Sequence, residues 1–485
     1  LAPLLWYICH IWEGEVSVTD KGEFIESLVQ RMSLRQKIGQ CVVVGMSGTT
    51  LTNDIREAIT RYQCGGIRLS PYYRNFQYFS AERAVRQELG PDFHPSLQKT
   101  HKQGFPPHRT PEEYAALLNE LRALAAARSP AVPLHMVIDQ EGDTSRDLAR
   151  GGVAQFPSSL GLAASGSPEL TYRVAKSVAL QVRASGVNMI HSPVVDVNIN
   201  PENPEIGKRA FGDDPELVAE HGSAMMHGLR DGGVIPCAKH FPGRGDSAAD
   251  AHFSCPVLEV DEERFQRVEL APYRRLIAEG LETIMLAHGI YRHRDPDRIS
   301  TVSPAIVTDL LRGELGFRGV ITTDSMTMGA LIDRYGSGEA CARALAAGAD
   351  IVLMKAENQW RGEVFHTLER WAQEGYLPEE ELDAKLRRIL ELKYRYGLFE
   401  RQGMVDASEA ARPYTDAYVR STAEIAAKGA MITVKDELEV LPLPTGRRIL
   451  LVNQALTLKT PNDVHDHPAL FQELLEAELP EIQTV

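Results

Sequence analysis

The chain lacks several features that mark whole classes of protein. Its six cysteines are scattered, with no CxxC pair and no zinc-site spacing, which favours buried, reduced thiols over a disulfide framework. Lys and Arg number 52 against 66 Asp and Glu, a net charge of -14, and no basic block occurs. We therefore expect no nucleic-acid partner and no binding to an anionic membrane surface. HExxH-like spacing and phosphate-binding glycine loops are also missing, so the sequence predicts no metal and no cofactor.

Membrane-length hydrophobic runs are absent too. Residues 1–12 are apolar, but they are too few to cross a bilayer and have no basic start and no small-residue cleavage site. We expect a soluble, cytoplasmic protein, while the missing initial Met leaves open a longer N-terminus that carried an export signal. The 485 residues, 43% hydrophobic and 24% charged, are enough for one large domain and a smaller one. Nothing in the sequence indicates an oligomeric state.

From about residue 22 the chain alternates between short apolar runs, rich in β-branched residues, and longer helical periods. This alternation is typical of a parallel sheet built from βα units. Eight such runs occur, at residues 39–45, 65–69, 134–138, 187–195, 234–238, 283–287, 319–323 and 349–354. The predicted fold class is therefore α/β, a (β/α)8 TIM-like barrel.

The domain boundaries follow from where this pattern begins and ends. We expect an N-terminal extension over residues 1–21, the barrel over 22–400, and a linker with the start of a smaller α/β domain over 401–485. A long insertion at residues 72–109 is aromatic, basic and without a clear period, and is interpreted either as a lid or as a surface excursion.

Helix starts are marked by a cap residue followed by proline. Thr110, Ser167, Asp214 and Ser303 each precede a proline, and Glu113 adds the carboxylate of a capping box. These positions predict the N-termini of barrel helices.

A barrel requires its chemistry at the C-terminal ends of the strands, where the βα loops gather. Polar residues follow five consecutive runs: Asp139 and Glu141, Asp196 and Asn198, Lys239 and His240, His288, and Asp324 and Ser325. Each alone could be a satisfied structural group. Together they predict one polar rim in which neighbouring charges tune each other's pKa values.

The loop at residues 239–252, KHFPGRGDSAADAH, is the densest stretch of chemistry in the chain. Asp250 lies two residues before His252, and a carboxylate so placed can hold an imidazole in one tautomer and raise its basicity. The alternative is a pair of solvated loop residues. A rim that offers a strand-end carboxylate, this acid/base dyad and several hydroxyl-binding groups suits the cleavage of a glycosidic bond.

These residues resemble the glycoside hydrolases of family 3, specifically their β-N-acetylglucosaminidase branch. The resemblance rests on the loop at 239–252, on IDQEG at 138–142, NPEIGKRAFG at 203–212 and GVITTDSM at 319–326, and covers about residues 30 to 400. It implies a retaining, exo-acting enzyme that removes terminal β-linked N-acetylglucosamine through a covalent glycosyl-enzyme, with a small carbohydrate as its partner and cell-wall or chitin fragments as candidate substrates.

The same resemblance implies roles for individual residues. Asp324 matches the nucleophile, and His252, oriented by Asp250, matches the acid/base. The positions that bind sugar hydroxyls are matched by Asp139, Lys239, His240 and Arg209.

Two departures from the family pattern lie at the rim. In Gly243-Arg244-Gly245, Arg244 replaces the histidine of the family's usual Gly-His-Gly. After Gly142, Asp143-Thr144 replaces the usual Gly-Arg. Two alternatives therefore remain. One is an enzyme of the same family with another β-glycoside or with phosphate as the acceptor, since Arg244 could attract an anion. The other is a non-catalytic sugar-binding protein.

Overall fold

A computed structural model describes residues 21–71, 109–142, 145–148, 152–252, 254–355, 358–434 and 437, and two short strands at 449–451 and 482–484. The predicted N-terminal extension and all but the last residue of the predicted insertion lie outside these residues. So do Asp143 and Thr144. Among the described helices, none is long and apolar enough to cross a bilayer.

The predicted α/β barrel is confirmed. Its strands are β1 (Val42–Ser47), β2 (Gly66–Ser70), β3 (His135–Ile138), β4 (Met189–Ile190), β5 (Ile235–Pro236), β6 (Ala238–Phe241), β8 (Thr283–Leu286), β10 (Val320–Ser325) and β11 (Ile351–Met354). All neighbours pair in parallel, in the order β5-β4-β3-β2-β1-β11-β10-β8-β6. Every apolar run predicted from the sequence contributes to this sheet.

The sheet closes through the fifth run. β5 pairs with β4 and β6 pairs with β8, and only Cys237 separates these two parts of one strand. Closure continues beyond the strand pair, since Lys239 N donates to Pro193 O (3.0 Å) and Val195 N donates to Lys239 O (2.8 Å). A closed barrel has no unpaired edge, and it brings the ends of all eight runs to one rim.

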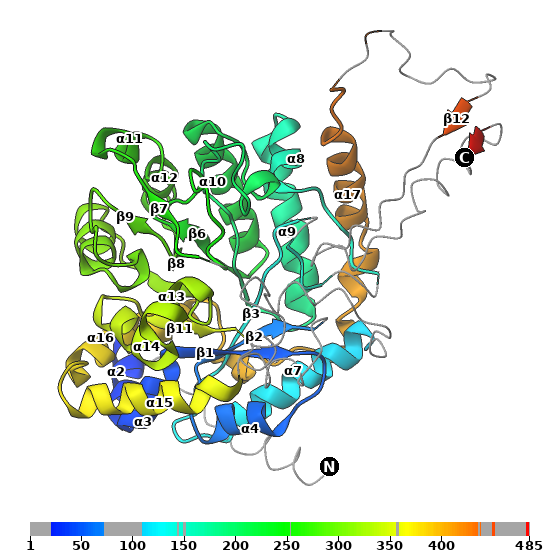
Figure 1. The fold of residues 1–485 in the computed structure, drawn as a ribbon. Helices are drawn as coiled ribbons and strands as arrows, with labels where there is room; N and C mark the ends of the chain where they lie inside the picture. The colour runs from blue at the N-terminus through cyan, green and yellow to red at the C-terminus, as the bar shows by residue number, and fades with distance from the viewer. Residues whose placement is uncertain are drawn as a thin grey trace.

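Helices surround the strands (Figure 1). Those after the first five runs are α4 (Asn53–Thr60), α7 (Pro111–Ala126), α8 (Ser159–Ala164), α9 (Pro168–Ala184), α10 (Pro215–Asp231), α11 (Glu262–Arg267) and α12 (Ala271–Ala278). The later ones are the π-helix η4 (Ala305–Glu314), α13 (Gly329–Tyr335), α14 (Ser337–Ala346), α15 (Asn358–Gln373) and α16 (Glu379–Arg395). Before the first strand lie α2 (Lys21–Arg31) and α3 (Leu34–Gln40), and β7 (Val257–Leu258) pairs with β9 (Ile290–Tyr291) beside the barrel.

Local sequence signals placed the helix starts correctly. The side chains of Thr110, Ser167 and Asp214 each accept a hydrogen bond from the first turn of α7, α9 and α10, and Thr110 with Glu113 forms the predicted capping box. Ser303 likewise accepts from Ile306 N (3.3 Å) at the start of η4.

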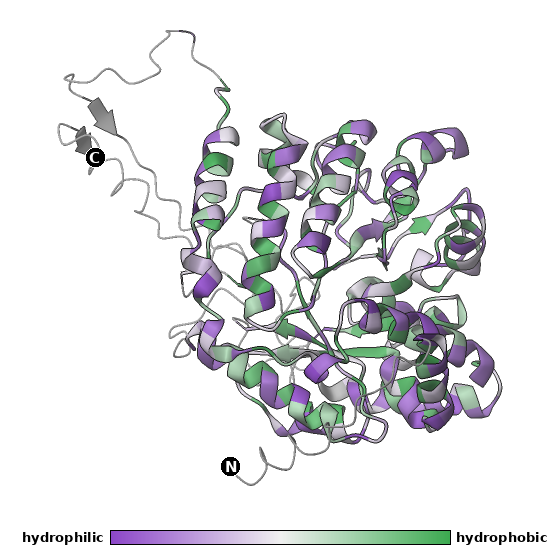
Figure 2. Cartoon of the chain, turned by 180° about the vertical axis from the view of Figure 1, so that it is seen from behind, coloured by the Kyte–Doolittle hydropathy of each residue, from purple (hydrophilic) through white to green (hydrophobic). Residues whose placement is uncertain are grey.

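The core lies between the strands and the inner faces of the helices. In Figure 2 the barrel strands are mostly hydrophobic, while most of the surrounding helices carry both hydrophobic and hydrophilic residues. Four of the five described cysteines, Cys41, Cys64, Cys237 and Cys341, are buried free thiols, as predicted, and Cys255 is partly exposed.

After the barrel, the chain forms α17 (Ala417–Gly429), capped by Asp416 and packed beside α9 (Figure 1). Two further strands, β12 (Ile449–Leu451) and β13 (Ile482–Thr484), pair in parallel. The prediction that a smaller α/β domain starts in this part of the chain stays a prediction.

Candidate active site

The predicted site residues gather at the C-terminal ends of the barrel strands. Asp139 follows β3, Lys239 and His240 lie in β6, and Asp324 lies in β10. The loop after β6 adds Asp250 and His252, and the turn between β4 and α10 adds Arg209. The structure thus brings all seven predicted residues to one rim.

Asp324 is a partly accessible carboxylate surrounded by cationic and imidazole groups. Its Oδ1 accepts a hydrogen bond from Ser325 N (2.7 Å), and its Oδ2 lies 3.6 Å from Arg244 Nη2 and 4.0 Å from His240 Nε2. Burial acts to raise the pKa of Asp324, but Arg244, His288, His252 and the Ser325 amide together outweigh burial and hold this pKa well below its ordinary value. The carboxylate is therefore ionised at neutral pH.

Asp250 and His252 form the predicted dyad. Asp250 Oδ1 lies 2.7 Å from His252 Nδ1 and also accepts a hydrogen bond from the His252 backbone N (2.8 Å). Burial opposes ionisation of Asp250, but its contacts with His252 lower its pKa below the ordinary value. Because Asp250 engages Nδ1, the ring orientation and tautomer of His252 are set by this contact.

Asp139 is the centre of a charged cluster at the end of β3. Arg68 of β2 forms an ion pair with it, Lys239 Nζ lies 3.3 Å and His191 Nδ1 3.4 Å from Oδ1, and Lys355 Nζ lies 3.8 Å from Oδ2. Burial raises the pKa of Asp139, but these groups, led by Arg68 and Lys239, bring it well below its ordinary value. A fixed carboxylate and ammonium side by side can bind adjacent sugar hydroxyls.

Lys239 and Arg209 share Glu141. The Lys239 ammonium lies 2.5 Å from Glu141 Oε1, and Arg209 donates from both Nε (2.8 Å) and Nη2 (3.0 Å) to the same carboxylate. The bidentate pair fixes the guanidinium plane of Arg209.

Two buried histidines support the rim. His240 Nδ1 lies 2.7 Å from Asp196 Oδ2, and burial with the nearby cations Arg244 and Arg209 holds the pKa of His240 well below its ordinary value. A neutral ring that donates from Nδ1 leaves Nε2 to accept from Arg209 Nη2 at 3.4 Å. Burial also lowers the pKa of His288 to about 4, and its Nε2 donates to Ser325 O (3.0 Å), directly after Asp324.

Sequence reasoning missed several residues at this rim: Arg68, Asp147, His191, Glu205 and Lys355. A signal was available for Arg68, a charged residue inside an apolar strand run, and for Lys355, the first polar residue after the eighth run. Glu205 lies within the NPEIG motif, but only the fold places its carboxylate beside the loop after β6.

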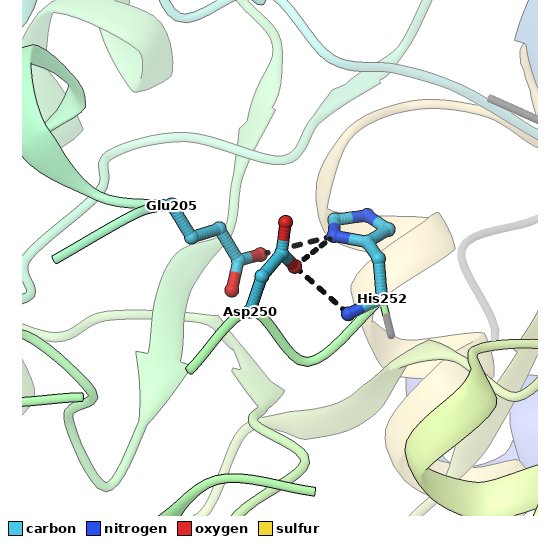
Figure 3. A group of neighbouring side chains, drawn as sticks. All are labelled: Glu205, Asp250 and His252. Atoms are coloured by element: carbon cyan, nitrogen blue, oxygen red, sulfur yellow. Dashed lines mark hydrogen bonds and ion pairs between the residues drawn. The ribbon is translucent and has the colours of Figure 1, made fainter. Parts of the chain in front are cut away.

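Glu205, Asp250 and His252 also form the one group in the described part of the chain that could hold a metal ion, with ligand atoms within 4.8 Å of one another (Figure 3). These ligand atoms already have protein partners, since Asp250 engages His252 and Glu205 pairs with Arg244 (2.7 Å). Asp246, in the same loop as Asp250 and His252, pairs with Arg264 (3.0 Å). The prediction of no metal stays a prediction.

Comparison with known proteins identifies relatives along most of the chain. A beta-hexosaminidase A of Pseudoalteromonas piscicida is 27% identical over 423 residues, covering 83% of this chain and 64% of that protein. A beta-N-acetylglucosaminidase/beta-glucosidase of Cellulomonas fimi is 31% identical over 348 residues, covering 70% of this chain and 60% of that protein. The chain therefore spans less than two thirds of the length of both relatives.

Comparison with solved structures finds the same kind of relative as the sequence comparison. The glycoside hydrolase family 3 beta-N-acetylglucosaminidase of Paenibacillus sp. str. FPU-7 superposes with a TM-score of 0.79 at 30% identity, over 94% of this chain and 79% of that one. The model of the glycosyl hydrolase family 3 N terminal domain matches residues 33–392, which contain all the barrel strands and every residue of the rim. The chain belongs to glycosyl hydrolase family 3.

Proposed function

We propose that this protein is a retaining, exo-acting β-N-acetylglucosaminidase that hydrolyses terminal β-linked N-acetylglucosamine. One observation carries the proposal: an ionised carboxylate, Asp324, and a hydrogen-bonded Asp250–His252 dyad occupy the same rim as the polar cluster of Asp139 and Lys239. The names of the relatives from Pseudoalteromonas, Cellulomonas and Paenibacillus, a beta-hexosaminidase and two beta-N-acetylglucosaminidases, support the same activity.

In this proposal Asp324 is the nucleophile. Its carboxylate oxygen bonds to the anomeric carbon as the glycosidic C–O bond breaks, which gives a glycosyl ester and one inversion of configuration. The low pKa keeps the attacking oxygen negatively charged. Water then attacks the same carbon and breaks the ester, and the second inversion restores the original configuration.

His252 moves the protons. In the first step its ring nitrogen remote from Asp250 gives a proton to the departing glycosidic oxygen, and in the second step the same nitrogen takes a proton from the attacking water. Asp250, bound to Nδ1, keeps the ring in one orientation and stabilises its positive charge.

Asp139, Lys239, Arg209 and His240 are proposed to bind the sugar. The Asp139 carboxylate accepts from hydroxyls while the Lys239 ammonium donates to them, and contacts of this kind that strengthen in the transition state raise kcat. Arg209 and His240 lie next to this pair, 3.4 Å apart between Nη2 and Nε2, with His240 Nε2 also 4.0 Å from Asp324.

A wider specificity is the second candidate. The Cellulomonas relative is named for both β-N-acetylglucosaminidase and β-glucosidase activity, which favours β-glucosides as further substrates. Phosphate as the acceptor is less well supported, since Arg244 is 3% exposed and already paired with Glu205. A purely sugar-binding role would leave the ionised Asp324 and the dyad without a purpose.

The physiological setting is part of the proposal. We place the protein in the cytoplasm, in keeping with its free cysteines, with cell-wall or chitin fragments as substrates. We also propose residues 22–400 as the catalytic barrel and 401–485 as a linker with the start of a second α/β domain, a division supported by the separate β12–β13 pair.

The test is hydrolysis of a matched pair of aryl β-glycosides, the N-acetylglucosaminide and the glucoside, by the wild-type chain, Asp324→Ala and His252→Ala, with and without phosphate. The expected result is cleavage of the N-acetylglucosaminide that is lost in Asp324→Ala. Faster turnover with phosphate and a sugar phosphate product would identify a phosphorylase instead. Failure of the folded wild-type chain to cleave either glycoside would overturn the proposal.

A further inference from the structure

Arg244 lies between two carboxylates at the rim. Its Nη2 is 2.7 Å from Glu205 Oε1 and 3.6 Å from Asp324 Oδ2, and its side chain is 3% exposed. The Arg244 backbone N donates to Asp196 Oδ1 (2.8 Å). A buried guanidinium is tolerated only beside compensating negative charge, so these two carboxylates determine where Arg244 lies.

Glu205 connects Arg244 to the dyad. The Oε1 atom that faces Arg244 also lies 3.5 Å from His252 Nδ1, and the Glu205 side chain is 6% exposed. Neither carboxylate oxygen has a well-aligned hydrogen-bond donor among the described residues. Arg244 is therefore the close counter-ion of Glu205, and Arg209 Nη1 lies farther away, at 3.9 Å from Oε1. Three successive contacts therefore join Asp324 to His252.

Asn203 holds the two loops together. Its Oδ1 accepts from Glu205 N (3.0 Å) and Ile206 N (2.9 Å), while its Nδ2 donates to Arg244 O (2.9 Å) and Gly245 O (3.1 Å). One buried amide thus fixes the backbone of Glu205 relative to that of Arg244. The Arg244–Glu205 ion pair is therefore supported by backbone contacts on both sides and does not depend on the two side chains alone.

We propose that Arg244 and Glu205 are a positioning pair. Together they keep the side chains of Asp324 and His252 at fixed positions relative to each other, both while the glycosyl ester forms and while it is hydrolysed. This inference rests on the function proposed above. In the free enzyme Arg244 compensates both carboxylates. When Asp324 becomes a neutral ester, Glu205 remains the counter-ion of Arg244, so the buried guanidinium keeps its place and Glu205 is not released toward His252.

Each charge therefore has a separate consequence when it is removed. In Arg244→Met, Glu205 keeps only the more distant Arg209, whose Nη1 lies 3.9 Å from Oε1, and turns toward His252 Nδ1, where it competes with Asp250. In Glu205→Gln, Arg244 keeps Asp324 as its ion-pair partner at 3.6 Å and Asp196 as a further nearby carboxylate. It loses the Asp324 charge when the ester forms, which slows the first step. Removing both charges together leaves neither member of the pair without its partner, and only the contribution of Arg244 at Asp324 is still lost.

The kinetic test compares wild type, Arg244→Met, Glu205→Gln and the double variant on an aryl β-N-acetylglucosaminide. We expect each single change to lower kcat/KM on the order of 10²-fold, and the double variant to lose much less than the product of both losses. Arg312→Met is the matched control, because Arg312 forms a comparable buried pair with Asp350 (2.6 Å) away from the rim. It is expected to lower stability and leave kcat/KM unchanged. The proposal would be overturned if the loss of kcat/KM in the double variant equalled the product of the two single losses. It would also be overturned if Arg312→Met lowered kcat/KM as much as the single changes at the rim do.

A structural test does not depend on turnover. A crystal structure of the full chain with Arg244→Met is expected to show the Glu205 carboxylate closer to His252 Nδ1 and Asp250 displaced. If Glu205, Asp250 and His252 keep their places, the pair has no positioning role. Should Arg244→Met fail to fold, Arg244→Lys retains the charge without the planar guanidinium and is expected to show a smaller shift of the same kind. An inactive wild-type chain would refute the proposed function alone, since this displacement is read from coordinates.

Discussion

Asp250 Oδ1 accepts a hydrogen bond from the backbone N–H of His252 (2.8 Å) and also lies 2.7 Å from the ring Nδ1 of the same residue. A carboxylate that binds two groups of one residue fixes both the position of its backbone and the orientation of its ring. The dyad is thus organised before substrate arrives, on a loop where the His252 side chain remains 36% exposed.

Replacing Asp250 by Asn tests this arrangement. We expect Asp250→Asn to lower kcat/KM about 10²-fold for a glycoside with a basic leaving group, because the ring loses the charge that supports its protonated form. The loss should be smaller for an activated aryl leaving group, which needs little protonation. Asp246→Asn is the matched control in the same loop, since Asp246 pairs with Arg264 and not with His252. Equal losses for both leaving groups would show that Asp250 does not act through proton transfer.

Arg68 is predicted to anchor Asp139. Arg68→Met removes a guanidinium that is 1% exposed and that also lies 2.7 Å from Asp147 Oδ2, and we expect a loss of about 3 kcal/mol in the free energy of unfolding at pH 7. Urea denaturation measures this loss, and the KM for the aryl glycoside should rise with it. Arg68→Lys keeps the charge and is expected to lose less.

The effect of Arg68 should depend on pH. The pKa of Asp139 in the folded protein lies below its unfolded value, so its ionised form adds stability above the unfolded pKa and loses that contribution as the pH falls through the folded pKa. The stability difference between wild type and Arg68→Met should therefore be largest at neutral pH and shrink in acid. A difference that stays constant with pH would show that Arg68 acts through packing alone.

Gly245, in the loop after β6 that carries Asp250 and His252, is predicted not to tolerate a larger side chain. A Cβ on Gly245 would lie 1.7 Å from Val197 O, a backbone atom that cannot move aside easily. We expect Gly245→Ala to cost about 1–3 kcal/mol of stability and to lower activity as the loop shifts. Gly313→Ala is the control, because the nearest atom to its Cβ would be Thr308 O at 3.5 Å. Thermal unfolding and kcat/KM are measured for both variants. Similar values for Gly245→Ala and Gly313→Ala would contradict the prediction.

A metal-free mechanism is predicted for the rim. Dialysis against EDTA should leave hydrolysis of the aryl glycoside unchanged, because protein groups already engage Glu205, Asp250 and His252. Activity that disappears on dialysis and returns with a divalent cation would assign these three residues to a metal site instead.

The sequence by itself determined the barrel and most of its rim. Apolar runs of strand length that alternate with helical periods allow few folds other than a parallel barrel, and the caps at Thr110, Ser167 and Asp214 depend only on residues within one helical turn. Because parallel strands present their C-terminal ends at one rim, the polar residues that follow the runs had to meet there. The position of Asp324 followed from this rule. Asp250 and His252 lie well beyond the end of β6, and only the folded loop brings them to the rim.

Only the tertiary structure decided which charges meet. Arg68 contacts Asp139 from a neighbouring strand, and Arg244 reaches both Glu205 and Asp324 from the loop after β6. Such contacts join residues far apart in the chain, and they depend on strand register, on barrel closure through β5 and β6, and on how each buried charge finds compensation. A local pattern carries none of this information, so the residues that tune Asp324 and Asp139 became evident only when the barrel closed.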